Sequence, residues 1–170
     1  MKLTDIIPLD KWIELEKEIN ARFNLNASVF DAMGNRITDF NKWANSLCPV
    51  VKANENGKRF ICAAAHQVIA AEATQTKKPA IETCDAGLIK LVVPVFLNET
   101  FMGVVGGCGL LRGEEEVDRF LIHKITGIEM EEIDRLTKDI GVIEADQIDS
   151  AVEYIQQEVN HIHGRKTRFS

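Results

Sequence analysis

Apolar residues recur with helical spacing near the N-terminus of the chain. The pattern predicts a helix over residues 8–23, with apolar side chains on one face and charges between them. Residues 27–31 and 36–40 then alternate like two antiparallel strands joined by a short glycine-containing turn. Residues 41–56 follow no period, and the alanine-rich stretch 58–76 predicts a second helix.

The stretch from Pro79 to Leu111 predicts a meander of three strands, over residues 80–84, 88–96 and 101–109. Simple pairing of the last two strands places Cys108 opposite Ile89, at the same end of the sheet as Cys84. Ideal pleating then puts these two cysteines on opposite faces, unless a bulge at Gly106 and Gly107 corrects the register.

Three further helices are predicted over residues 114–125, 129–139 and 145–163. The last one carries an apolar seam that can pack on the domain's own sheet or on a second copy of the chain. The seam consists of Ile148, Val152, Ile155, Val159 and Ile162. We expect a homodimer through this helix. The expected division is a sensory body over residues 1–142 and a signalling helix with a basic tail over 143–170.

The order of elements predicts an α+β fold. One helix, a hairpin, an irregular segment and a three-strand meander together give a PAS-like five-stranded antiparallel sheet. The helices are expected on one side of this sheet, followed by a long C-terminal helix.

Composition and charge narrow the function. The chain has 170 residues and a net charge of −6, which disfavours nucleic acid and anionic lipid as partners. It opens without a signal peptide and contains no apolar run of membrane-spanning length, so a cytoplasmic location is expected. Enzyme signatures such as a phosphate-binding glycine loop or a nucleophile elbow are missing, and we expect a protein that is not an enzyme.

The four cysteines are the main candidates for chemistry. In a reducing compartment, Cys48, Cys62, Cys84 and Cys108 are thiols or metal ligands before they are disulfides. Four thiolates complete the ligand set of a 4Fe-4S cluster or of zinc. Glycines beside two of them can bring backbone amides toward sulfur, which favours the cluster over zinc. The spacings of 13, 21 and 23 intervening residues contain no close pair, and small buried cysteines also serve simply as apolar residues.

A histidine and several aromatic residues extend the candidate site. His66 lies one helical turn from Cys62, so a set of three cysteines and His66 is an alternative ligand set. A small-molecule pocket is expected between the irregular segment and the sheet, although the aromatic residues can equally be core. Its candidate residues are Phe40, Trp43, Phe60, His66, Gly87 and Gly107.

The string SLCPVV…KRFICAAAHQ…KKPAIETCDAGLIKLVVPV resembles the PocR-type sensory domain family. The resemblance runs from Leu9 to about Leu111. It carries over to Cys48, Cys62, Cys84, Ala86, Gly87, Leu88 and Pro94. The family often has Gly-Gln where this chain has Gly107-Cys108, so the fourth cysteine is a departure.

The resemblance implies a PAS-like domain of the kind attached to transcription regulators, histidine kinases and cyclases. Domains of this family are thought to sense small metabolites such as short diols. We therefore expect a sensory module that binds a metabolite, or reports redox state through the four-cysteine site, and relays the signal to its C-terminal helix. The downstream regulator is open. The alternatives are a metal-free thiol redox switch or thiol oxidoreductase, and a structural domain with inert cysteines.

Overall fold

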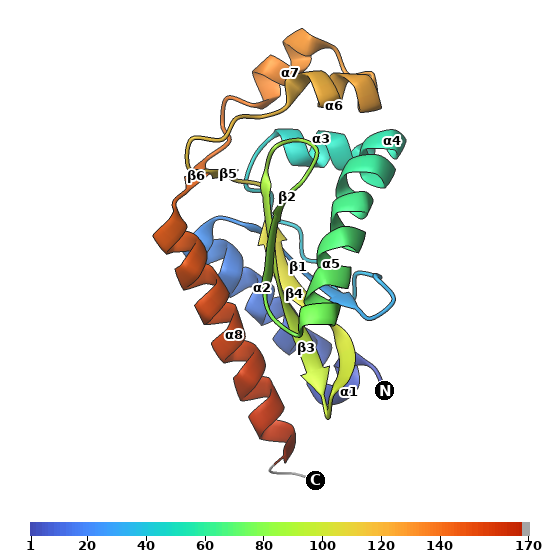
Figure 1. The fold of residues 1–170 in the computed structure, drawn as a ribbon, viewed down its shortest axis with the longest axis vertical. Coiled ribbons are helices and arrows are strands. Elements are labelled where there is room, and N and C mark those ends of the chain that lie inside the picture. Colours follow the sequence, from blue (N-terminus) through green and yellow to red (C-terminus); the bar gives the residue numbers. More distant parts are fainter. Residues whose placement is uncertain (168–170) are drawn as a thin grey trace.

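A computed structural model describes the backbone of residues 1–167 and the side chains of residues 1–164. The basic tail expected at the C-terminus falls outside the described side chains. Four strands form one antiparallel sheet in the order β1-β4-β3-β2 (Figure 1). They are β1 (Asn26–Asp31), β2 (Ala80–Thr83), β3 (Ile89–Leu97) and β4 (Thr100–Cys108). The expected α+β class is confirmed.

The sheet has four strands and not the expected five. The segment 36–40 makes a single bridge, between Phe30 and Arg36, and then leaves the sheet. Polar side chains explain the departure. The Thr38 hydroxyl donates to Glu16 on the neighbouring helix, and the Arg36 guanidinium donates to the Phe40 carbonyl, which folds the segment back on itself.

Helices cover both faces of the sheet, which corrects the expectation that they gather on one side. On one face, α2 (Leu9–Phe23) and α8 (Ala145–Thr167) pack over the main core (Figure 1). On the other face, Ile69 and Ala73 of α5 (Ala64–Thr76) pack against Val92 and Val104. The cause is visible in β3, where both sets of alternating residues are apolar and need cover.

The α8 seam packs within the chain. Ile148, Ile155 and Val159 are buried in the core beside α2 and β3, and Val152 and Ile162 are partly buried against it. Short α1 (Leu3–Ile6) also contacts α8. The sequence allowed the seam to pack on its own domain or on a second copy of the chain. The structure shows it packed on its own domain.

A bulge in β4 determines the face of the sheet on which each of the later side chains of this strand lies. The pairing of β3 and β4 shifts between Val95 and Phe96, so Val95 lies opposite Gly103 and Phe96 opposite Phe101. Cys108 therefore lies opposite Lys90 and not opposite Ile89. One extra residue moves every later side chain to the other face. The bulge is at the hairpin end of the strand and not at the glycines 106 and 107.

Small helices cap one end of the sheet. These are α3 (Leu47–Ala53), α4 (Glu55–Gly57), the π-helix η1 (Lys58–Ala63), α6 (Arg119–Thr126) and α7 (Met130–Leu136). They share a second apolar cluster that includes Leu47, Ile61, Ile122 and Ile133. A parallel pair, β5 (Leu111–Arg112) and β6 (Val142–Ile143), ties this cap to the start of α8.

Several helices differ from their prediction: the helix expected over 129–139 spans Met130–Leu136, and the last one continues to Thr167. The helix expected from Glu114 begins at Arg119, because the Asp118 side chain accepts from the Leu121 amide as an N-cap. The helix expected over 58–76 starts with the π-helix η1, and α5 follows it directly.

Candidate functional site

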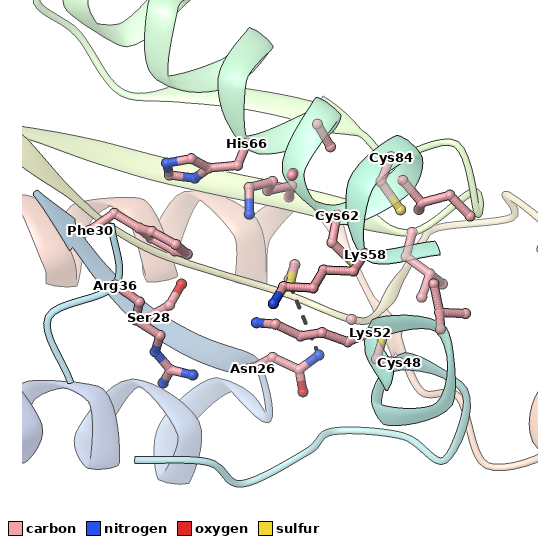
Figure 2. Close-up of a pocket in the computed structure, with 18 of the residues that line it drawn as sticks. Asn26, Ser28, Phe30, Arg36, Cys48, Lys52, Lys58, Cys62, His66 and Cys84 are labelled. Carbon is pink, nitrogen blue, oxygen red and sulfur yellow. Dashed lines mark hydrogen bonds between the residues drawn. The ribbon is translucent and has the colours of Figure 1, made fainter. Parts of the chain in front are cut away.

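A cavity of about 780 Å³ lies between the sheet, the segment 33–43, α3 and the helix formed by η1 and α5 (Figure 2). Its volume is in the range of small-molecule sites. The cavity lies at the end of the sheet that α3 and α4 cap.

The floor of the cavity comes from the alternation of the strands. On β1, Ala27 and Val29 enter the main core, so Asn26, Ser28 and Phe30 face the cavity. On β3 and β4, the same alternation and the bulge bring Lys90 and Cys108 to this face, opposite each other. The floor is thus polar, although the buried residues farther along this sheet face, Ala80, Val92 and Val104, are apolar.

The walls come from the helical segments. The π-helix η1 and α5 supply Lys58, Cys62 and His66, and α3 supplies Cys48 and Lys52. Figure 2 shows Lys52 and Lys58 extending side by side into the pocket from these two helices. π-helical turns are rare and frequently lie at functional sites.

The charge of the cavity is one-sided. Five of its lining residues are cationic and none is an aspartate or glutamate. The cations are Arg36, Lys42, Lys52, Lys58 and Lys90. The chain as a whole has a net charge of −6, so this positive cavity contrasts with the rest of the molecule.

Arg36 is held by the protein itself. Its guanidinium pairs with the buried Glu16 at 3.5 Å and donates to the carbonyls of Ala27 and Phe40. Burial raises the pKa of Glu16, and the bonds from Thr38, Arg36 and the Val29 amide act in the opposite direction. This group fastens the segment 36–40 to α2 and fixes one wall of the cavity.

Lys90 and His66 meet at the Phe30 ring. The His66 and Phe30 ring centroids are 3.9 Å apart, and the Lys90 Nζ lies 5.8 Å from the Phe30 centroid. Lys90 exposes 9% of its surface and His66 exposes 7%. Burial, together with the charges of Lys90 and Lys52, lowers the pKa of His66 to about 4. His66 is therefore neutral at pH 7, and its Nδ1 has no hydrogen-bond partner within the described chain.

All four cysteines line the cavity, and Figure 2 shows Cys48, Cys62 and Cys84 at the end away from His66. They carry free thiols. Burial raises the pKa of Cys48, of Cys84 and of Cys62, the last to about 11. Neutral thiols are poor nucleophiles, so this environment disfavours thiolate chemistry without a metal.

The Sγ atoms of two cysteines accept hydrogen bonds from asparagine amides. Asn45 Nδ2 lies 3.3 Å from Cys48 Sγ, and Asn26 Nδ2 lies 3.9 Å from Cys108 Sγ (Figure 2). Backbone groups of Leu88 and Ala86 hydrogen-bond to the Cys84 thiol in its turn and oppose the rise of its pKa. Among residues 1–164, no group of three or more Cys, His, Asp or Glu side chains has the arrangement of a metal site.

The pocket residues expected from the sequence lie in different places. Trp43 and His66 line the cavity. Phe60 is exposed on the outer side of η1, with Arg59 over its ring, and Phe40 does not line the cavity. Gly87 packs on the backbone of Glu116, and Gly107 faces Leu25 on the other side of the sheet.

Sequence reasoning missed the lysines of the cavity. Lys90 was detectable, because it is the one charge in the otherwise apolar strand Ile89–Leu97. Such a lysine is almost never fully buried without a reason. Lys52 and Lys58 carried no comparable signal, since they lie in segments with many charged neighbours.

The sheet, its flanking helices and this cavity define an α+β, PAS-like domain built around a pocket of ligand size. The chain belongs to the PocR sensory domain family, because a family model described as the sensory domain found in PocR matches residues 5–166. This confirms the resemblance and extends it through α8. No curated protein and no solved structure matches the chain. None of the helices described is long and apolar enough to cross a membrane.

Proposed function

We propose that this chain is the sensory module of a signalling system and that it binds a small molecule in the cavity. The observation that carries the proposal is the polar floor of Asn26, Ser28 and Lys90 on a sheet face whose other buried residues are apolar. A core packed only for stability gains nothing from buried polar side chains, whereas a ligand site uses a few of them to orient its ligand. Membership of a family of sensory domains supports the same function.

The proposed output is α8. Lys90 faces the cavity, and its neighbours Ile89 and Leu91 lie in the core against which α8 packs. A ligand that shifts β3 by a small amount therefore acts on α8 through one layer of sheet. A homodimer through α8 also stays a proposal, and it would use the exposed side of the helix, because the seam is buried in the chain's own core.

A thermal-shift screen of short diols and short carboxylic acids tests the cavity. A compound present at 100 times its Kd stabilises a protein by about 2.7 kcal/mol, or about 5–10 °C in Tm for a chain of this size. Ser28→Phe fills the floor and should abolish the shift. Thr83→Phe, at an exposed position of the same sheet, should keep it. Slower amide exchange in α8 on binding would support the relay. A screen without any stabilising compound, or a shift that survives Ser28→Phe, would contradict the proposal.

A metal held by the four cysteines is a second candidate, and the convergence of thiols from four segments on one cavity favours it. A metal would deprotonate the thiols, and Lys52 and Lys90 would offset part of their charge. The side chains would have to rearrange, since no ligand group is preformed in the described chain. A 4Fe-4S cluster and zinc remain the two choices, and a metal-free thiol switch is the alternative.

An ultraviolet–visible spectrum and metal analysis of protein purified without oxygen test this second candidate. A cluster should give broad absorbance near 400 nm with iron and sulfide, and zinc should give about one metal per chain without colour. Cys84→Ser should remove the metal. A colourless, metal-free protein whose thiol count falls on mild oxidation would indicate the switch. If the thiol count also stays constant, the cysteines are inert.

A further inference from the structure

The cavity holds buried positive charge that the described protein does not neutralise. Lys90 is nine-tenths buried and forms no ion pair within the described residues; its nearest compensation is the face of Phe30. Lys52 is half-buried with its ammonium group near the Trp43 ring. Burial of an unpaired ammonium group is costly, and a contact with an aromatic ring offsets only part of that cost.

The cations act on one another across the cavity. Burial lowers the pKa of Lys52, and the charges of Arg36 and Lys90 lower it further. The same Lys90 and Lys52 charges depress the pKa of His66. Positive potential is therefore concentrated toward the Phe30 end of the cavity, where the Nδ1 of His66 is buried without a hydrogen-bond partner in the described chain.

The neighbouring carboxylates are those of Glu82 and Glu16. Glu82 lies directly opposite Lys90 on β2, but its side chain is exposed and the two form no ion pair within the described residues. Oε1 of Glu16 accepts from Thr38, Arg36 and the Val29 amide, and Glu16 does not line the cavity; its Oε2 is buried without a partner in the described chain. Within the described residues, no carboxylate therefore pairs with Lys90.

We propose that the ligand of this cavity is a small organic oxyanion, with its charged group bound by Lys90 and Lys52 and its body against Phe30 and the apolar wall. The proposal rests on the function proposed above and gives its ligand a chemical class. Ser28 on the floor supplies a neutral hydroxyl below the Phe30 ring (Figure 2). The lysines act as point charges, which suit a carboxylate or a phosphate equally. This class differs from the neutral diols that the family resemblance implies.

A matched pair of compounds tests the charge requirement. The probes are 2-hydroxybutyrate and 1,2-butanediol, which share a carbon skeleton and differ in one carboxylate. Inorganic phosphate, formate and methylphosphonate distinguish carboxylate from phosphate recognition. Binding is followed by calorimetry and by the ring resonances of His66. The His66 pKa should rise when an anion binds, because the anion offsets the charges of Lys90 and Lys52 that face this ring.

Lys90→Met removes the charge with little change of shape, and Lys78→Met is the control at an exposed lysine outside the cavity. The loss of a buried charged hydrogen bond should weaken anion binding by about 10- to 100-fold. Lys90→Arg should retain most of the affinity, and Lys78→Met all of it. The affinity for the diol should not change in any variant.

The outcomes separate the two proposals. Tighter binding of an anion than of the diol, lost in Lys90→Met, supports both. Binding of the diol alone, or anion binding that Lys90→Met leaves intact, overturns the oxyanion proposal and leaves the sensory cavity standing. If neither the anions nor the diol shift the His66 resonances, the oxyanion proposal fails, and the wider screen then decides the cavity proposal separately.

Discussion

Replacement of Ile155 by aspartate should lower the free energy of unfolding by about 3–5 kcal/mol, the cost of an uncompensated charge in a packed core. Ile155 is fully buried on the inner face of α8, in the cluster that contains Trp12, Ile19 and Leu91. The substitution removes apolar burial and brings a carboxylate into a region without a buried partner. Urea unfolding followed by circular dichroism measures the effect.

Gln157→Asp is the matched control for this prediction. It places the same carboxylate on the exposed side of the same helix and should change stability by no more than about 0.5 kcal/mol. Sedimentation of the wild type and both variants gives the oligomeric state in parallel. If Ile155→Asp kept full stability and only dissociated a dimer, the seam would be an interface between chains, and its packing on the sheet described above would be wrong.

Gly103→Ala should be the second most damaging substitution, with a loss of about 2–4 kcal/mol. Gly103 sits at the bulge with φ 150°, and a Cβ there would overlap the Phe30 carbonyl oxygen on the adjacent strand. The paired strands of the centre of the sheet cannot separate without losing their hydrogen bonds. The midpoint of urea unfolding is again the measurement.

Gly113→Ala separates the steric part of this effect from the backbone part. Gly113 also has a positive φ, of 54°, but a Cβ there would meet nothing within 4 Å. It should cost only about 1 kcal/mol, the penalty of the left-handed conformation. Equal losses in the two variants would mean that the close approach of β1 to β4 is not a constraint. A Gly103→Ala protein that folds with a shifted register would turn Cys108 out of the cavity.

The four strands of the main sheet and the longer helices followed from the sequence pattern, whereas the short elements and the arrangement of helices around the sheet did not. The run Leu91–Val95 is apolar at every position, which indicates a strand buried on both faces. That signal argues against helices on one side only, and the structure has them on both. The missing fifth strand depends on Arg36 and Thr38 bonding to Glu16, which is distant in sequence, and no local pattern reveals these bonds.

The candidate site was partly visible in the sequence. The cysteine-centred turn at Cys84 and the family resemblance pointed to the region in which all four thiols and His66 now lie. The register of Cys108 depended on one inserted residue near Met102. Bulges are set by the close contacts of particular strands, here of Gly103 with Phe30, and so they escape a count of alternating residues. The positive cavity depended on three lysines from three separate elements.

Because side chains alternate along β1 and β3, neighbouring residues of these strands lie on opposite faces of the sheet. Asn26, Ser28 and Lys90 face the cavity, whereas Ala27, Val29 and Leu91 face the core shared with α8. Substitution of a cavity residue therefore changes the chemistry of the cavity without removing any contact of α8, the proposed output helix. In evolutionary terms, the two properties can be inherited and altered separately. A scaffold of this kind can exchange one effector for another by a few point mutations and keep its signalling route intact.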